Sequence, residues 1–431
     1  MDYLNDGDPN TSNDLGITGI WLMPMMESPT YHGYDVSDYY EIEVDYGTME
    51  DFEEFLEQSH LRGIKVIIDL VLNHTSNQHP WFIQSANNQN NYRDWYIWSE
   101  NNPGFTGPWG QNIWHYNQGN YYYGLFWSGM PDLNYEHQSV KQEMINVANF
   151  WLNKGVDGFR LDAIKYLIED ASNLENTPAT FSLIEDFNSA YKYTSSKSFT
   201  IGEVWSNTNF VIPYVQNGRL DACFDFDLAS NIINSVNSGS SAGLQQQILT
   251  IRESYPALQF GTFLTNHDMD RVYNKLGYNN EKMKLAASIY LTMPGIPFIY
   301  YGEELGMVGT GSHENIRRPM QWSSSTNSGF TNSIPWKSIG NNYLTNNVEI
   351  MSNNDHSLMN HYKKLIKIRN EQSALRRGNI LILENESEEL LSFIRTFRNK
   401  AVLFNCNLSL NLLNPTISLS KSSIPKGNYY L

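Results

Sequence analysis

The sequence contains few cysteines, no long apolar run and no recognisable export signal. Its 431 residues include two cysteines, Cys223 and Cys406, which are too few and too far apart for a disulfide framework. We expect two reduced, partly buried thiols. No stretch approaches the roughly 18 consecutive apolar residues of a transmembrane helix. The first eight residues lack the basic and apolar regions of a signal peptide. The chain as written is therefore expected to be cytoplasmic, or secreted or periplasmic if its natural N-terminus lies upstream.

Positive charge is also scarce, with 29 lysines and arginines against 46 aspartates and glutamates and a net charge of −17. Nucleic acids and anionic membranes attract the opposite sign, so neither is an expected partner. Aromatic residues, by contrast, are abundant: 27 Tyr, 20 Phe and 11 Trp, many of them among Asn, Gly and Gln. Core packing explains most aromatic residues in any protein, but flat rings with polar rims also suit the faces and edges of sugars. The composition favours a carbohydrate ligand over a polyanion.

Short apolar runs recur along the chain, with amphipathic helical segments such as 48–61 and 141–152 between them. Strand–helix alternation of this kind predicts a parallel α/β architecture. An eight-stranded barrel would need one more strand upstream of Met1, so we expect either a fragment of a longer gene product or a truncated reading frame. The seven predicted strands are Ile17–Met23, Ile64–Leu70, Val156–Leu161, Phe199–Val204, Leu220–Phe226, Gln259–Leu264 and Ile296–Tyr301.

A long insertion, about Ser76–Tyr135, separates the second and third runs and is rich in Asn, Gly, Trp and Tyr. Long insertions after barrel strands commonly carry substrate contacts. After residue 370 the strand–helix rhythm ends, and two further strands are predicted at Leu391–Phe397 and Ala401–Leu408. We therefore expect three domains: a catalytic barrel over 1–75 and 136–370, an inserted substrate-binding domain over 76–135, and a partial C-terminal β-domain over 371–431.

Two of the predicted strands end on a carboxylate, Asp162 and Glu203. The C-terminal ends of parallel barrel strands open into one mouth, so both carboxylates should reach the same space. Arg160, two residues before Asp162, projects to the same face and would keep Asp162 ionised, as a nucleophile requires. Glu203 has no basic neighbour in sequence, which is compatible with a raised pKa and an acid/base role. Such a pair predicts a retaining glycoside hydrolase, whose two carboxyl groups lie about 5–5.5 Å apart.

Two other strand ends carry an acid close to a histidine. Asp268 follows His267 after one strand, and Asp69 precedes His74 at another. The transition state of glycoside hydrolysis is a distorted, oxocarbenium-like sugar. Acids and imidazoles that grip the ring hydroxyls favour that distortion. Either pair alone could be an ordinary loop hydrogen-bonding group, whereas two pairs at two strand ends strengthen the prediction of a sugar site.

These segments resemble the four signature regions of the α-amylase family of glycoside hydrolases, in the family's order and spacing and over essentially the whole chain. The resemblance implies a (β/α)8 TIM-type barrel, here without its first strand, with an inserted domain after the third barrel strand and a C-terminal antiparallel β-domain. It implies Asp162 as nucleophile, Glu203 as acid/base and Asp268 as transition-state stabiliser. The implied substrate-binding residues are Tyr34, which would stack under the reacting sugar, together with His32, Asp69, His74, Arg160, Lys165 and His267.

Other segments place the chain within the family. Met130–Asn134 resembles the fifth region, Gly295–Glu304 the eighth-strand region, and Arg317–Trp322 a motif shared with oligo-1,6-glucosidases. This mixture resembles bacterial α-amylases that lie between typical amylases and α-glucosidases. One departure is that Tyr166 follows Lys165 where typical amylases have a histidine. That change concerns the leaving-group side of the site and any backbone calcium ligand there.

Calcium is the one cofactor that the resemblance raises, and no organic cofactor is expected. Asn73 and Asp132 match positions that bind calcium in many amylases. No other ligand is matched, and a simple hydrogen-bonded connection to the inserted domain explains the pair better. The metal ligands are therefore left unassigned.

The resemblance predicts a monomeric enzyme that cleaves internal α-1,4-glucosidic bonds in starch-like glucans or maltodextrins. An α-glucosidase, an oligo-1,6-glucosidase or a glucanotransferase is the neighbouring alternative. A different class is a non-catalytic α-glucan-binding protein on the same scaffold, because a truncated barrel can lose activity. The presence of all three acids argues against that class.

Overall fold

The described chain divides into two units. The computed structural model describes residues 1–8, 10–11, 13–170, 173–420 and 422. The first unit comprises Met1–Thr11, Ile17–Trp205 and Phe210–Cys223, and the second comprises Ser12–Gly16, Ser206–Asn209 and Phe224–Leu431. Residues 421 and 423–431, at the end of the predicted C-terminal domain, lie outside the described residues.

Parallel strands form the centre of the first unit. Their order is β1-β4-β8-β9-β10, and every neighbouring pair is parallel. The apolar residues of β4 are buried, as expected for strands covered on both faces. Each strand lies inside a predicted run, which confirms the first five predicted strands. Their bounds are β1 (Gly19–Leu22), β4 (Lys65–Leu70), β8 (Gly158–Leu161), β9 (Phe199–Gly202) and β10 (Ala222–Phe224).

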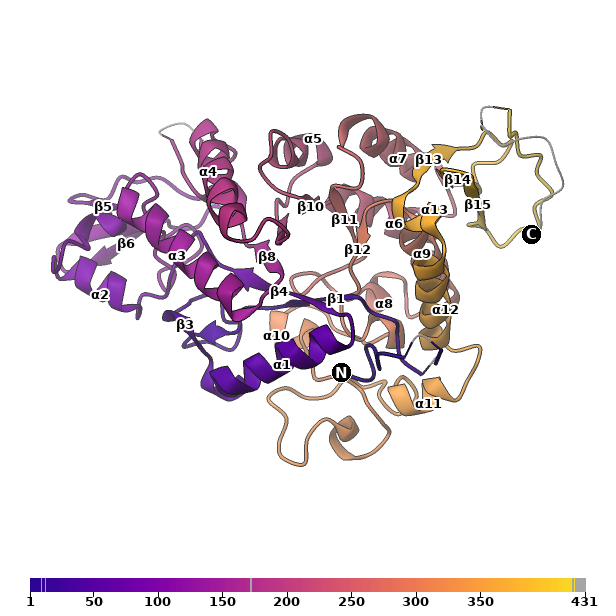
Figure 1. Cartoon of the computed structure of the whole chain (residues 1–431), viewed down its shortest axis with the longest axis horizontal. Helices are drawn as coiled ribbons and strands as arrows, with labels where there is room; N and C mark the ends of the chain where they lie inside the picture. The colour runs from indigo at the N-terminus through magenta and orange to yellow at the C-terminus, as the bar shows by residue number, and fades with distance from the viewer. Residues whose placement is uncertain (9, 12, 171–172, 421, 423–431) are drawn as a thin grey trace. The chain divides into compact units, whose positions relative to one another are not determined.

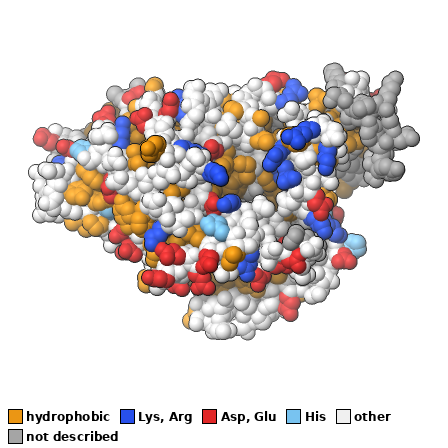
Figure 2. Space-filling view, viewed as in Figure 1, with side chains coloured by type: hydrophobic (Ala, Val, Ile, Leu, Met, Phe, Trp, Pro, Cys, Tyr) orange, Lys and Arg blue, Asp and Glu red, His pale blue; other side chains and the backbone are white. Residues whose placement is uncertain are grey.

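Helices alternate with these strands, as the sequence predicts (Figure 1). α1 (Met49–Leu61) packs on β4 and begins with a capping box, in which Thr48 and Asp51 satisfy each other's backbone N–H groups. α3 (Gln138–Lys154) packs beside α4 (Pro178–Thr194) and ends at Gly155, whose φ of 105° is left-handed. Figure 2 shows acidic side chains gathered over α1, in line with the net charge. The shorter helices of this unit are η1 (Val44–Tyr46), η3 (Ile164–Tyr166) and η4 (Ile212–Val215), with α5 (Thr208–Val211) across the unit boundary.

The insertion between β4 and β8 has secondary structure that its sequence does not reveal. It contains a three-stranded antiparallel sheet with the order β5-β7-β6. The strands are only two to four residues long, too short for a visible alternation of apolar and polar residues. The elements are α2 (Pro80–Ala86), η2 (Arg93–Trp95), β5 (Trp98–Ser99), β6 (Trp114–Asn117) and β7 (Asn120–Tyr123). A hairpin of β2 (Met26–Glu27) and β3 (Asp38–Ile42) follows β1.

The second unit contains the last two predicted parallel strands and a separate antiparallel sheet. β11 (Phe260–Thr262) and β12 (Ile296–Pro297) pair in parallel. β13 (Asn379–Ile382), β14 (Leu390–Phe397) and β15 (Lys400–Asn407) form the antiparallel sheet, which confirms both predicted C-terminal strands and adds β13. The helices are α6 (Phe226–Ser238), α7 (Ala242–Ser254), α8 (Val272–Lys275), α9 (Asn280–Thr292), η5 (Glu303–Leu305), α10 (His313–Ile316), η6 (Thr326–Gly329), α11 (Val348–Ser352), α12 (Leu358–Glu371) and α13 (Ser373–Arg377).

Both cysteines are free thiols, as predicted, and both are buried rather than partly exposed. Burial in β15 raises the pKa of Cys406 to about 12, so this thiol stays protonated at neutral pH. Among the described residues, no helix is both long and apolar enough to cross a bilayer.

Candidate active site

The register of three neighbouring strands brings the predicted site residues of the first unit together. Asp69 on β4 lies directly across from Arg160 on β8. Asp162 and Glu203 each occupy the first position after their strands, which pair at Leu161 and Gly202. Because parallel neighbours at the same level point to the same side of a sheet, all four side chains face one space.

Arg160 is the centre of this group. Its Nη1 donates to Asp162 Oδ1 at 2.6 Å and to the two oxygens of Asp69 at 2.9 and 2.8 Å. Its Nη2 lies 2.6 Å from Glu203 Oε2. One guanidinium therefore contacts three carboxylates and bridges the two that the sequence predicts to be catalytic. We call these four residues the Arg160 cluster.

The Arg160 cluster is almost completely buried, and this changes its titration. Arg160 and Asp69 are 0% exposed, and Asp162 and Glu203 are 7% and 9% exposed. Burial disfavours the charged form of Arg160, but the carboxylates around it hold its pKa well above the ordinary value. Burial raises the pKa of Asp69, against the opposing attraction of Arg160, and the charge of Glu203 adds to that rise. Three carboxylates share one cation, so the cluster favours holding a proton.

Glu203 is not isolated from positive charge in the folded chain, contrary to the prediction from its sequence neighbours. Glu203 lacks a basic neighbour in sequence, but Arg160 from the adjacent strand lies 2.6 Å from it. Strand pairing supplies a cation that spacing along the chain could not reveal. An acid role for Glu203 must therefore rest on competition among three carboxylates for one arginine and not on isolation from positive charge.

The turn after Asp162 holds the two carboxylates in place. Ala163 has a left-handed backbone with φ 46°, which is uncommon for a residue other than glycine. Its N–H donates to Glu203 Oε2 at 3.4 Å, so the turn reaches across to the neighbouring strand end. Gly202 leaves room for this turn, because a Cβ there would lie 2.6 Å from Ile164 Cδ1. The strained turn is thus built around the carboxylate pair.

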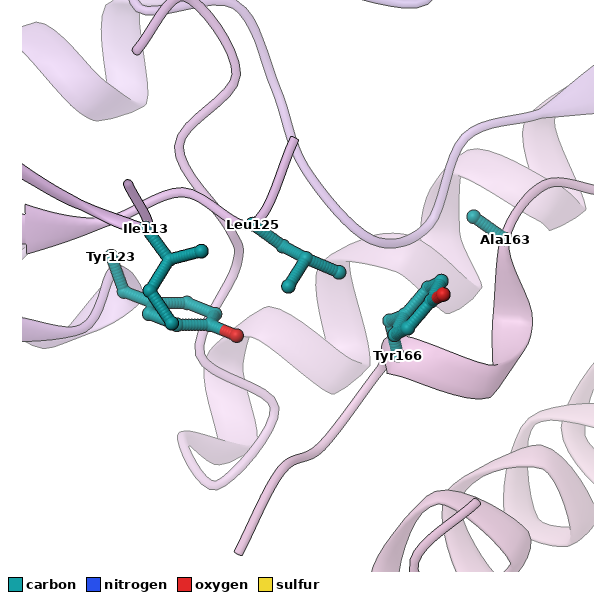
Figure 3. Close-up of a cluster of buried hydrophobic side chains, with 5 residues drawn as sticks. All are labelled: Ile113, Tyr123, Leu125, Ala163 and Tyr166. Carbon is teal, nitrogen blue, oxygen red and sulfur yellow. The ribbon is translucent and has the colours of Figure 1, made fainter. Parts of the chain in front are cut away.

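A small apolar cluster anchors the same turn to the inserted segment. Figure 3 shows Ala163 and Tyr166 on the turn side, with Leu125 between them and the remaining two residues of the insertion. Its members are Ile113, Tyr123, Leu125, Ala163 and Tyr166. This packing connects the inserted segment to Ala163, the residue next to Asp162.

Tyr34, His32 and His74 lie around the Arg160 cluster. Tyr34 donates its hydroxyl to Asp69 Oδ2 at 3.0 Å and accepts from Arg160 Nη1 at 3.3 Å. The ring of His32 stacks near that of Tyr34, with centroids 6.1 Å apart, and His32 Nδ1 accepts the Tyr34 N–H at 3.1 Å. His74 is buried, and burial lowers its pKa to about 3, so its imidazole is neutral at neutral pH.

Asp268 in the second unit is surrounded by donors. Arg317 Nη2 donates to its Oδ1 at 2.8 Å, and His267 Nε2 lies 2.9 Å from its Oδ2. His313 Nδ1 lies 3.5 Å from Oδ1. Arg317 also donates through Nε to the backbone carbonyl of His267 at 3.0 Å. This arrangement, the Asp268 cluster, fixes the carboxylate through several groups at once.

Comparison with known proteins shows which family the chain resembles. The alpha amylase catalytic-domain family matches residues 12–378. Alpha-amylase 3 of Dictyoglomus thermophilum is 40% identical over 400 residues, which cover 92% of this chain and 78% of that protein. The oligo-1,6-glucosidase of Bacillus cereus is 30% identical over 490 residues, covering 95% and 85%. The crystal structure of an alpha-amylase from H. orenii superposes with a TM-score of 0.87 at 42% identity, covering 94% of this chain and 83% of that one.

The chain belongs to the α-amylase family. Its catalytic domain is therefore a TIM-type (β/α)8 barrel, seven of whose parallel strands are formed by the described residues, and an antiparallel β-domain follows. The protein is a glycoside hydrolase of that family.

The residues that match calcium positions in the α-amylase family make hydrogen bonds to each other and to the inserted segment. Asn73 Nδ2 donates to Asp132 Oδ2 at 2.9 Å, and the Leu125 N–H donates to Asp132 Oδ1 at 3.0 Å. Both oxygens of Asp132 are thus occupied by donors. Across the described part of the chain, no three His, Cys, Asp or Glu side chains are grouped so that they could hold a metal ion. The hydrogen bonds of Asp132 connect the end of β4 to the inserted segment.

Lys165, the expected sugar contact next to Tyr166, is engaged by protein groups. Its Nζ lies 2.6 Å from Glu175 Oε2 and donates to the Trp205 carbonyl at 3.1 Å. These contacts tie the turn after Asp162 to the loop after Glu203. The departure at Tyr166 therefore coincides with a tight connection between the two strand ends.

Sequence reasoning missed two partners of the site. Arg317 lies in a motif that was noticed, but its ion pair with Asp268 is a contact across about 50 residues that spacing does not show. Phe126 lies in the insertion, and its ring centroid is 5.2 Å from that of His74. The aromatic richness of the insertion was the available signal, but it did not single out this ring.

Proposed function

We propose that this chain hydrolyses internal α-1,4-glucosidic bonds of starch-like glucans or maltodextrins with retention of configuration. The observation that carries the proposal is the buried Arg160 guanidinium, 2.6 Å from both Asp162 and Glu203. Two carboxyl groups held at one arginine, on adjacent strand ends, provide the paired acids that a retaining glycosidase needs.

In the proposed reaction, Asp162 attacks the anomeric carbon while Glu203 donates its proton to the leaving glycosidic oxygen. The bond between that carbon and the oxygen breaks as the covalent glycosyl–Asp162 ester forms. Glu203 then takes a proton from water as the water attacks the same carbon, which releases the sugar and restores both carboxyl groups. Asp268 is proposed to grip sugar hydroxyls in the transition state.

Crowding in the Arg160 cluster favours retention of one proton, and the proposed mechanism places that proton on Glu203. When all three carboxylates are ionised, the cluster holds three negative charges and the one positive charge of Arg160 in a buried space. Carboxyl groups that contact the same guanidinium repel one another when all are ionised, so one proton is retained and the three groups titrate together. The two distances to Arg160 are equal, 2.6 Å for Asp162 and 2.6 Å for Glu203, so the negative charge is assigned to Asp162 by its proposed role as the nucleophile.

A second candidate is an exo-acting α-glucosidase, and in particular an oligo-1,6-glucosidase. The ion pair between Arg317 and Asp268 favours it, because Arg317 begins the motif that resembles those enzymes. A relative 30% identical to this chain carries the name oligo-1,6-glucosidase.

Product analysis separates these candidates. The enzyme is incubated with amylose, maltose and isomaltose, and the products are resolved over time, with Asp162→Asn as the blank. The proposal predicts a rapid loss of amylose length and a mixture of maltooligosaccharides. Glucose alone from amylose would contradict endo action, and faster cleavage of isomaltose than of amylose would establish the second candidate.

A further inference from the structure

The inserted segment presents an exposed tryptophan in a firmly held turn. Trp109 is 60% exposed, which is unusual for so large an apolar side chain. The backbone N–H of Trp109 donates to Gln111 Oε1 at 2.9 Å, and Gln111 Nε2 donates to the Leu125 carbonyl at 2.9 Å. Gly107 closes the turn through its N–H to the Gln111 carbonyl at 2.8 Å, and a side chain at Gly107 would clash with the Gln111 amide. The backbone of the turn that carries the exposed ring is therefore held in one place.

The same ring adjoins the active site through aromatic contacts within the first unit. The Trp109 centroid lies 5.7 Å from that of Phe126 and 6.1 Å from that of Tyr166. Phe126 in turn contacts His74 at 5.2 Å. Tyr166 belongs to η3, which begins two residues after Asp162. Trp109 is thus the outer end of an aromatic wall whose inner end lies beside the catalytic strand ends.

We propose that Trp109 is a stacking platform for a glucosyl unit of the α-glucan chain beyond the sugar that reacts. The inference rests on the proposed function, because it assigns the platform to that substrate. The C–H face of a pyranose ring is apolar and its edge is polar, which suits an exposed indole with open solvent around it. Because the turn is already fixed, binding would order little of the protein, and more of the stacking energy would remain as affinity.

A purely structural role for Trp109 predicts different behaviour. A ring that mainly completes the apolar packing would be covered, whereas more than half of this side chain is open to solvent. Tyr116 on β6 offers a matched control. It lies in the same inserted segment, is 68% exposed and packs against the ring of Tyr121 at 5.5 Å.

The test compares Trp109→Ala, Trp109→Phe and Tyr116→Ala on a long and a short substrate. kcat/KM is measured with maltohexaose and with maltotriose for each full-length variant and the wild type. We expect Trp109→Ala to lower kcat/KM for maltohexaose by about fivefold to tenfold, the size of an aromatic stacking contact. The value for maltotriose should change less than twofold, so the ratio of the two constants falls. Trp109→Phe should keep most of the ratio, and Tyr116→Ala should keep all of it.

The inference is overturned if Trp109→Ala leaves the ratio unchanged, if both substrates lose equally, or if Tyr116→Ala has the same effect. Failure of the proposed function looks different. If the wild type does not cleave maltohexaose, both the function and the platform are contradicted, whereas a wild type whose length preference ignores Trp109 contradicts only the platform.

Discussion

The Arg160 cluster and the Asp268 cluster contain opposite balances of acids and bases. In the first, three carboxylates surround one guanidinium. In the second, one carboxylate is surrounded by an arginine and two histidines. The first cluster is buried, while the Asp268 side chain is 24% exposed.

This difference matches the separate roles that we propose for the acids. Surplus carboxylates competing for one cation favour holding a proton, which is what acid/base chemistry requires. A single carboxylate among several donors acts as an oriented acceptor, which suits hydrogen bonding to a charged or hydroxyl-rich transition state. The variants below test whether the two clusters differ in this way.

The largest expected difference lies between Asp162→Asn and Asp268→Asn. Asparagine at 162 cannot form the glycosyl ester, so kcat should fall by at least about 10⁴-fold. Asparagine at 268 removes the charge, but neither Asp268 nor its asparagine replacement forms a covalent bond to the sugar, so the fall in kcat should be smaller. kcat on maltohexaose measures both, with exposed Asp186→Asn as the control that should match the wild type. Substantial activity in Asp162→Asn would refute the nucleophile assignment.

The next difference concerns the two arginines. Arg160→Gln removes the cation that contacts three buried carboxylates, and losing one partner of a buried ion pair costs about 3–5 kcal/mol. Arg317→Gln leaves Asp268 with two histidines and partial exposure, so about 1–2 kcal/mol is expected. Urea unfolding at pH 7 gives both free energies. Equal losses, or a larger loss for Arg317→Gln, would contradict the contrast between the clusters.

A smaller effect should appear as a pH dependence. The folded-state pKa of Asp69 is raised, so folded protein binds more protons than unfolded protein above about pH 4, the ordinary aspartate value. Stability from this group is therefore complete at low pH and is lost as pH rises through its folded pKa. Relative to Asp69→Asn, the wild type should lose unfolding free energy between pH 5 and pH 8. If the difference in unfolding free energy between the wild type and Asp69→Asn stays constant or rises with pH, the pKa of Asp69 is not raised in the folded protein.

The smallest effect is expected from removal of divalent ions. Asp132 already accepts hydrogen bonds from Asn73 and Leu125, so dialysis against a chelator should leave activity and Tm unchanged within error. Readdition of calcium serves as the control. A fall in Tm that calcium reverses would show that calcium stabilises the folded protein and would contradict this expectation.

The strands could be predicted because each is a short, mainly apolar run, as in Lys65–Leu70. The sheet of the insertion could not, because Trp98–Ser99 and its neighbours are too short to show a period. Asp162 and Glu203 could be predicted for the same reason as the strands, since each directly follows one. What sequence spacing cannot supply is register between strands.

Register decides the electrostatics of the site. The pairing of Leu161 with Gly202 brings Arg160 to Glu203, and the pairing of Asp69 with Arg160 completes the cluster. In the sequence Arg160 is close only to Asp162, whereas in the fold it contacts Asp69, Asp162 and Glu203. The same limitation hides the contact between Arg317 and Asp268 and the aromatic wall that ends at Trp109.

The most direct test of the account is to trap the covalent intermediate. Glu203→Gln is incubated with α-glucosyl fluoride, whose leaving group needs no proton, so the first step proceeds while the second lacks its general base. Peptide mass spectrometry should then find one added glucosyl unit on the peptide that contains Asp162, and none in the double variant with Asp162→Asn. A glucosyl adduct on another carboxylate, or fluoride release by that double variant at the same rate, would contradict the account.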